Sequence, residues 1–283
     1  MNVLVTPFSS NSFMLHALIA GVLVSIACAI VGTFVILRGL AFIGDALAHG
    51  VLPGIAVAIL VGFPGIIGAA IGAAFMIGGI TTITQRSRLS SDTAIGLLFV
   101  GMLSLGVVII SRSNSFSGDL TRILFGEILG IGIPAILIQL IATIIIAVIA
   151  VICARPFLLL SFDREQAEVA GFSVRLYHNI MLLMIAATVV VSFQTVGTLL
   201  VFGLLIAPAG AGALLARRIE AMMAWAMLFG VLSMYSGLLI SYHFGLATGA
   251  AIVLVAVAIF FVVFIVQNIR HRHLVQTQEL RHG

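Results

Sequence analysis

An aspartate and a histidine stand four positions apart in the apolar stretch GLAFIGDALAHGVLPGIAVAIL, residues 39–60. Residues four apart on a helix lie on the same face, so Asp45 and His49 are expected to point the same way. An ionised aspartate near the centre of a membrane costs about 2.5–3.5 kcal/mol and normally faces a partner or a wet cavity. The pair is therefore either a structural contact or a site that a charged species passes.

The chemistry of this pair suits a divalent transition metal. A carboxylate oxygen and an imidazole nitrogen without a thiolate favour Zn²⁺, Mn²⁺ or Fe²⁺ over Cu⁺, and binding requires Asp45 ionised and His49 neutral. Pro53 is expected to mark a helix break: it has no N–H, so a helix here would leave the His49 carbonyl oxygen without its usual bond and free as a further ligand. Two side chains do not define a metal site. They become four if two copies of the chain face each other across a pathway.

The rest of the sequence must place this pair in a membrane. The 283 residues are 62% hydrophobic and 8% charged, and apolar runs of about 20 residues recur along the chain. Each such run matches the length of a membrane-spanning helix. We expect an all-α polytopic membrane protein in which residues 1–283 form a single transmembrane domain. The net charge of +4 does not indicate nucleic-acid binding, because the arginines are spread over the loops between spans.

Eight long runs are expected to span fully, at about 14–37, 42–62, 64–84, 94–111, 130–153, 179–202, 222–241 and 248–268. A shorter piece, 203–217, contains Pro208 and is expected to be a short broken crossing with a helix break at that proline. With nine crossings and the N-terminus outside, all the arginines except Arg112 and Arg122 are cytoplasmic. The positive-inside rule therefore predicts an N-out/C-in orientation.

At this point the sequence resembles a known family. The stretch LRGLAFIGDALAHGVLPG is similar to the G-D-x-x-x-H-x-x-x-P-G signature of the ABC-type manganese/zinc/iron permease family, and the similarity covers most of the chain. The resemblance implies the permease subunit of an importer in a bacterial inner (plasma) membrane. It implies a homodimeric channel, two cytoplasmic ATPase subunits and an extracytoplasmic metal-binding protein. Asp45 and His49 of both protomers would line the route of the ion.

The resemblance also limits what this chain does by itself. The transported ion, Mn²⁺ or Zn²⁺ and by extension Fe²⁺, is cargo, and no permanently bound cofactor or enzymatic activity is expected of this subunit. The chain contains no lysine, so it cannot form a phosphate-binding loop of the G-x-x-x-x-G-K-[ST] type. ATP is therefore expected to bind a separate chain.

The longest polar cytoplasmic stretch lies at about 161–178. Asp163 and Gln166 resemble a capping box and Gly171 a helix stop, which predicts a short helix along the inner surface. The stretch resembles the family's ATPase-coupling segment. The resemblance implies that four residues of this chain form a contact patch for the ATPase: Asp163, Glu165, Glu168 and Gly171. The alternative is an interfacial helix that only anchors the loop.

Two further segments carry expectations about partners. The external run DLTRILFGEIL is similar to a stretch of the family, which implies that Asp119 and Glu127 help to receive the binding protein; a solvated loop is the alternative. The basic cytoplasmic tail, 269–283, is expected to meet the headgroups of membrane lipids, and a metal-sensing tail is the alternative.

One functional alternative stays open on the sequence alone. A stand-alone proton-coupled metal transporter or channel would use Asp45 as a proton relay, and dependence on ATP separates the two cases. Counting helical rise places Asp45 near the cytoplasmic end of its span. An intramembrane protease is disfavoured, because the sequence contains no H-E-x-x-H motif.

Overall fold

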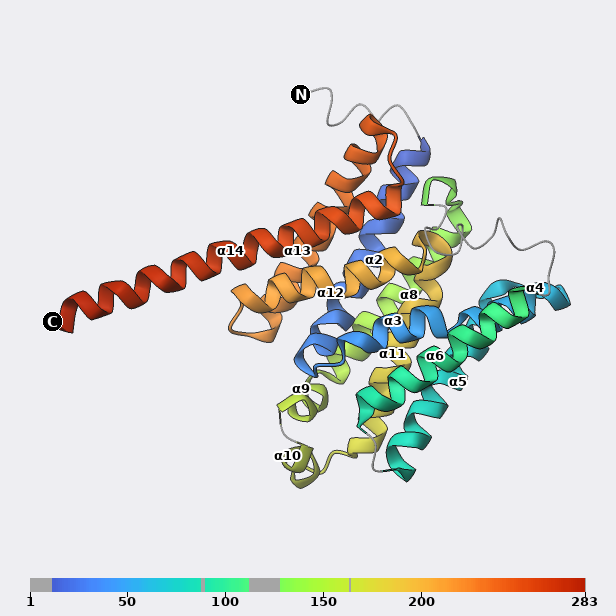
Figure 1. The fold of residues 1–283 in the computed structure, drawn as a ribbon, viewed down its shortest axis with the longest axis horizontal. Coiled ribbons are helices and arrows are strands. Elements are labelled where there is room, and N and C mark those ends of the chain that lie inside the picture. Colours follow the sequence, from blue (N-terminus) through green and yellow to red (C-terminus); the bar gives the residue numbers. More distant parts are fainter. Residues whose placement is uncertain (1–11, 88–89, 112–127, 163, 283) are drawn as a thin grey trace.

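The computed structural model describes residues 12–87, 90–111, 128–162 and 164–282. These residues form helices joined by short turns, with no strand among them (Figure 1). The helices, with one 3₁₀ turn (η1), are α2 (Ser12–Leu37), α3 (Ala41–Gly50), α4 (Leu52–Val61), α5 (Gly65–Arg86), α6 (Ser91–Ser111), η1 (Ile128–Gly130), α8 (Ile133–Ile152), α9 (Ala154–Phe162), α10 (Arg164–Val169), α11 (Val174–Val196), α12 (Thr198–Leu215), α13 (Ile219–Phe244) and α14 (Thr248–His282).

Nine segments of the described chain are long and apolar enough to cross a membrane, with α3 and α4 together forming one of them. The prediction of an all-α polytopic membrane protein is confirmed. Helices are the natural solution, because each satisfies its backbone hydrogen bonds internally where lipid offers none. An odd number of crossings puts the two ends of the chain on opposite faces, and the N-out/C-in orientation stays a prediction.

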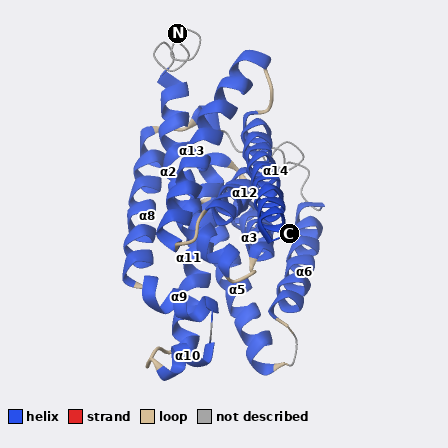
Figure 2. Cartoon of the chain, turned by 90° about the vertical axis from the view of Figure 1, so that its left-hand side faces the viewer, coloured by secondary structure: helices blue, strands red, loops and turns tan. Residues whose placement is uncertain are grey.

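The helix ends that carry most of the predicted cytoplasmic arginines lie together. A nitrogen of the Arg38 guanidinium, just beyond α2, lies 3.1 Å from Nδ1 of His178, near the start of α11. Thr81, near the end of α5, lies 3.5 Å from Asn179 in a side-chain contact. Figure 2 shows α9 and α10 together at one end of the bundle.

The junction between α11 and α12 differs from the sequence-based prediction. The chain breaks at Gly197 and not near residue 202, because Gly197 has φ 81° and ψ 158°. That backbone conformation is essentially restricted to glycine. The expected short broken crossing is instead part of a continuous 18-residue helix, α12, with Pro208 in its interior. Pro208 therefore does not break the helix, although it removes one backbone hydrogen bond there.

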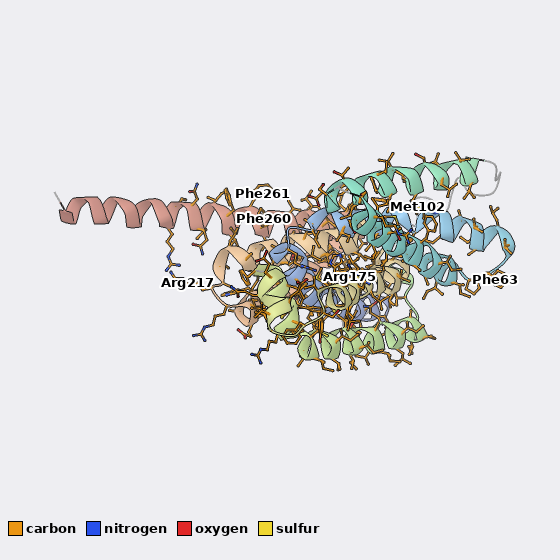
Figure 3. The ribbon with its side chains drawn as sticks, turned by 90° about the horizontal axis from the view of Figure 1, so that it is seen from below. Phe63, Met102, Arg175, Arg217, Phe260 and Phe261 are labelled. Atoms are coloured by element: carbon orange, nitrogen blue, oxygen red, sulfur yellow. The ribbon has the colours of Figure 1, made fainter. Side chains whose placement is uncertain are left out.

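Helix α12 lies at the centre of the bundle and packs against α2, α13 and α14. Glycines make these approaches close: a Cβ at Gly203 would lie 2.8 Å from Val253 of α14, and one at Gly212 would lie 2.7 Å from the Met222 carbonyl of α13. Small residues at helix crossings let backbones approach in this way. The predicted basic tail continues α14 as one 35-residue helix to His282, and Figure 3 shows this helix projecting beyond the bundle.

Candidate metal site

The span that carries the predicted metal ligands is broken in its middle. Helix α3 ends at Gly50, and α4 begins at Leu52 with Pro53 in its first turn. A proline is well tolerated there, because the N–H that it lacks would have no partner within the helix. The predicted helix break near Pro53 lies at Val51 in the structure. In the structure, the Val51 N–H is directed toward the carbonyl oxygens of His49 and Leu47.

Asp45 and His49 lie side by side on α3. Oδ1 of Asp45 is 3.3 Å from Nε2 of His49, and the two side chains are 24% and 23% exposed. Most of the other residues of α3 are buried in the protomer: Ile43, Gly44, Ala46, Leu47, Ala48 and Gly50. The polar pair therefore occupies the face of α3 that the chain's own packing leaves partly open.

The pair lies deeper than helical rise alone predicted. The His49 ring meets Phe99, close to the middle of α6, with ring centroids 6.0 Å apart. A Cβ on Gly50 would lie 2.8 Å from Cγ of Met76, close to the middle of α5. The site is thus level with the middle of two neighbouring spans. Asp45 still lies near the start of the span Ala41–Val61, as counting helical rise predicts, although this part of the span is level with the interior of its neighbours.

The physical reason for this depth is the turn that joins α2 and α3. Arg38, at that turn, contacts His178, which lies one turn inside the start of α11. The turn therefore lies within the bundle, level with the first turns of α11, and α3 begins at that depth. Gly44 accordingly faces Leu205, near the middle of α12, where a Cβ would lie 2.6 Å from the leucine side chain.

The geometry of the pair fits two ligands of one metal ion. Nitrogen and oxygen atoms bonded at about 2.1 Å to one metal lie about 3.0 Å apart at a right angle and about 3.4 Å apart at the tetrahedral angle. The observed separation of 3.3 Å between Nε2 and Oδ1 falls within that range and is also the distance of a direct contact between the two side chains. Within the described residues no third His, Cys, Asp or Glu completes a cluster. The described part of one chain could therefore supply two side-chain ligands at this place, Asp45 and His49.

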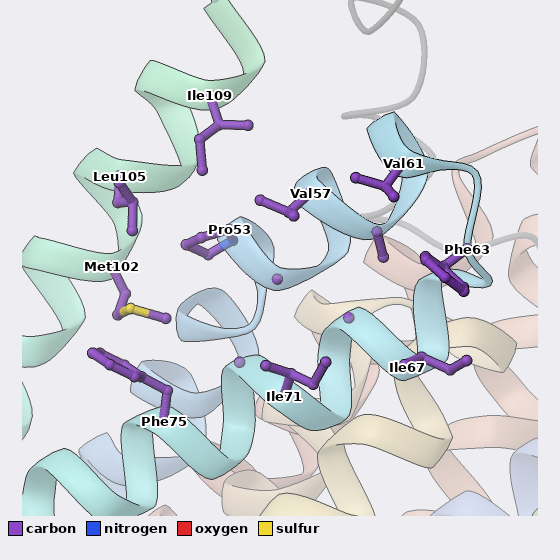
Figure 4. Close-up of a pocket in the computed structure, with 14 residues that line it drawn as sticks. Pro53, Val57, Val61, Phe63, Ile67, Ile71, Phe75, Met102, Leu105 and Ile109 are labelled. Carbon is purple, nitrogen blue, oxygen red and sulfur yellow. The ribbon is translucent and has the colours of Figure 1, made fainter.

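An apolar groove of about 410 Å³ begins one helical turn beyond His49, between α4, α5 and α6 (Figure 4). It is lined by Pro53, Val57, Ile71, Met102 and Leu105 among others, and no lining side chain carries oxygen or nitrogen. The groove therefore offers a hard divalent cation no side-chain ligand. Of these two features, the Asp45–His49 pair is the one with metal-binding chemistry.

The predicted coupling segment forms a short helix, α10, that ends at Val169 and is followed by the expected stop at Gly171. Gly171 has φ +83°. The Phe172 N–H donates to the Ala167 carbonyl at 3.0 Å, and the Gly171 N–H donates to that of Glu168 at 3.0 Å. Together these bonds form a Schellman motif. Glu165 and Glu168 are exposed.

A cavity of about 880 Å³ lies beside α10, between α9 and the start of α13. Arg155, Glu165 and Glu220 are among its lining residues, so both signs of charge meet there. The patch residue Asp163 lies outside the described residues. The predicted docking residues Asp119 and Glu127 also lie outside them.

Phe99 is the residue at this site that sequence reasoning did not single out. It is one of 19 phenylalanines in an apolar chain, and no spacing sets it apart. Only the packing of α6 on α3 brings its ring to His49. A motif search finds residues that share one helix, whereas this contact joins two helices about 50 positions apart.

Comparison with known proteins finds similar membrane transport proteins. Residues 10–267 match the family described as ABC 3 transport family. The "Manganese transport system membrane protein MntC" of Listeria monocytogenes is 40% identical over 254 residues, 90% of each chain. The "Probable iron transport system membrane protein" of Haemophilus influenzae is 36% identical over 260 residues, 92% of this chain and 96% of the relative. A solved structure, PsaBC from Streptococcus pneumoniae in complex with Fab, superposes with a TM-score of 0.82 and 34% identity, covering 92% of this chain and 94% of that one.

Proposed function

This chain belongs to the ABC 3 transport family, and from that premise we propose that it is the membrane-spanning subunit of an ATP-driven importer of Mn²⁺. Two features support the choice of ion. The relatives include proteins named for manganese transport, and the donor set of Asp45 and His49 consists of oxygen and nitrogen without sulfur. One observation carries the proposal: Oδ1 and Nε2 lie 3.3 Å apart on a partly open face of an otherwise apolar helix.

In this proposal, two copies of the chain share one metal site. Two copies of the chain, facing each other across the pathway, would contribute two carboxylates and two imidazoles. The two carboxylate charges balance the charge of one divalent ion, which lowers the cost of taking the ion out of water. The partial exposure of both side chains, 24% and 23%, leaves them reachable from outside the protomer. Transport follows when the bundle opens this mid-depth site first to one side and then to the other.

The energy for this alternation comes from a partner. The chain has no lysine and hence no phosphate-binding loop of its own. An ATPase subunit would dock at the cytoplasmic end on the coupling patch of Asp163, Glu165, Glu168 and Gly171. Helix α10 can transmit force there, because Ala167 is buried against Leu160 of α9 and Val174 of α11. The segment with Asp119 and Glu127 would receive the extracytoplasmic binding protein.

The test is metal uptake by proteoliposomes that contain this chain with its ATPase partner. We expect Mn²⁺ uptake to require internal ATP. Asp45→Asn and His49→Ala should each reduce uptake by more than about tenfold, because each removes a direct ligand. Asp92→Asn removes an exposed carboxylate at the start of α6 and serves as the matched control with normal uptake. Competition by Zn²⁺ and Fe²⁺ measures the preference between metals.

Several outcomes would overturn parts of this proposal. Near-normal uptake in both site variants would remove Asp45 and His49 from the pathway. Uptake driven by a proton gradient without ATP would replace the importer with a stand-alone proton-coupled transporter. Mixed assemblies of one wild-type and one Asp45→Asn chain, purified through a different affinity tag on each, should transport poorly; wild-type transport by such assemblies would argue against a shared site.

A further inference from the structure

One aromatic side chain from α6 lies across the face of α3 that carries the metal pair. Phe42, Asp45 and His49 occupy positions i, i+3 and i+7 and therefore share a face of α3. The Phe99 ring meets Phe42 at a centroid distance of 5.5 Å and His49 at 6.0 Å, with interplanar angles of 75° and 63°. Both are edge-to-face arrangements, which aromatic rings prefer. Phe99 thus contacts both ends of the stripe that has Asp45 in the middle.

The orientation of the imidazole decides whether the pair can share an ion. Nε2 of His49 faces Oδ1 of Asp45 at 3.3 Å. The terminal torsion of a histidine is broad, so the backbone of α3 does not fix the ring by itself. If the imidazole turns away, Nε2 remains a ligand atom but can no longer bind the same ion as the Asp45 carboxylate. Binding sites hold their ligand atoms to within about 0.5 Å of the productive position. The Phe99 ring is partly buried and packs against the hydrophobic core, which gives it a fixed position.

We propose that Phe99 is a positioning residue for the metal pair. Its ring holds the His49 imidazole in the orientation that lets Nε2 and the Asp45 carboxylate bind the same ion. This inference rests on the proposed function, because it requires Asp45 and His49 to be the ligands. Phe99 itself offers the ion no ligand atom, so its effect passes through His49.

The test compares variants of the assembled transporter in lipid nanodiscs and proteoliposomes. Phe99→Leu keeps an apolar side chain but removes the ring, Phe99→Tyr keeps the ring, and Phe261→Leu makes the same change at an exposed position of α14. We expect Phe99→Leu to weaken equilibrium Mn²⁺ binding about two- to tenfold, the range for loss of one aromatic pair. The KM for uptake should rise by the same factor while kcat stays within about twofold. Phe99→Tyr and Phe261→Leu should behave as the unaltered protein.

A double-mutant cycle separates this role from simple packing. In a His49→Ala background, Phe99→Leu should weaken Mn²⁺ binding no further, because the group that it positions is gone. If Phe99→Leu keeps its full effect there, or lowers kcat alone, the positioning role is overturned. If His49→Ala by itself binds and transports Mn²⁺ normally, the proposed function fails first. If the Phe99→Leu chain does not assemble, Phe99→Met is tested in its place, because methionine fills similar space without a ring. The same outcomes then apply.

Discussion

The crossing of α4 and α5 gives a sharp test of the packing that holds the span with Asp45 and His49. Gly54 of α4 and Gly68 of α5 meet backbone to backbone. A Cβ added at Gly68 would lie 2.6 Å from Cβ of Ala58 and 2.6 Å from the carbonyl carbon of Gly54, and closer still to the Gly54 carbonyl oxygen. Real Cβ contacts below 3.0 Å are essentially absent from proteins, so Gly68→Ala must push the helices apart.

The size of the effect follows from that distance. Ordinary contact begins at 3.4 Å, so the crossing must open by about 0.8 Å or more. A gap of that size forfeits about a quarter to a half of the dispersion energy of each contact across it. Overpacking of this kind costs about 1–3 kcal/mol. Gly78→Ala is the matched control in the same helix, because its Cβ would meet nothing within 4 Å. In the control, the higher helix propensity of alanine should raise the free energy of unfolding by about 0.8–1.0 kcal/mol. Gly68→Ala has the same gain, and the cost of the clash is subtracted from it.

The assay is equilibrium unfolding in mixed micelles, followed by helical circular dichroism and by the fluorescence of Trp225, the only tryptophan. We expect Gly68→Ala to lie about 1–3 kcal/mol below Gly78→Ala in free energy of unfolding. Because α4 continues directly from α3, uptake of Mn²⁺ should also fall in Gly68→Ala and not in the control. Equal stabilities for the two variants would show that α4 and α5 do not cross at these glycines.

Two other positions carry predictions of the same kind. Gly197→Ala should lower the free energy of unfolding by about 1–3 kcal/mol, because alanine is strained at φ 81° and ψ 158°. Gly101→Ala is the control and should not lower the free energy of unfolding, because Gly101 has open space around it. Equilibrium unfolding of both variants measures the difference. Gln139→Leu should cost about 1 kcal/mol, because the buried Ser192 hydroxyl loses the Gln139 oxygen 3.4 Å away. Adding Ser192→Ala should recover part of that loss, and an additive double variant would contradict the contact.

The position of the site suits a carrier better than a surface binding site. His49 is level with the middle of α5 and of α6, so an ion bound there is remote from both ends of those helices. The groove that begins one helical turn beyond His49 is apolar, so in the proposed transporter the Asp45–His49 pair is the place that would stabilise a divalent ion. Small relative movements of α3 against α6 would then change which side reaches the ion.

The sequence by itself determined the membrane class and the candidate ligands. Unbroken apolar runs predict spanning helices because lipid cannot satisfy a bare backbone, and nine segments of the described residues are long and apolar enough to span a membrane. The spacing of Asp45 and His49 placed both on one helical face, and the structure brings their side chains to 3.3 Å. These properties are local, so periodicity and length suffice to predict them.

Tertiary structure decided the break at Gly197, the continuity of α12 through Pro208, the depth of the site and the contact of Phe99 with His49. A glycine or a proline has several conformations open to it, and only the packing around it selects one. The depth of α3 depends on where the turn after Arg38 lies against α11. Such features arise from contacts between helices that are far apart in the chain, and the order of residues within one helix carries no record of them.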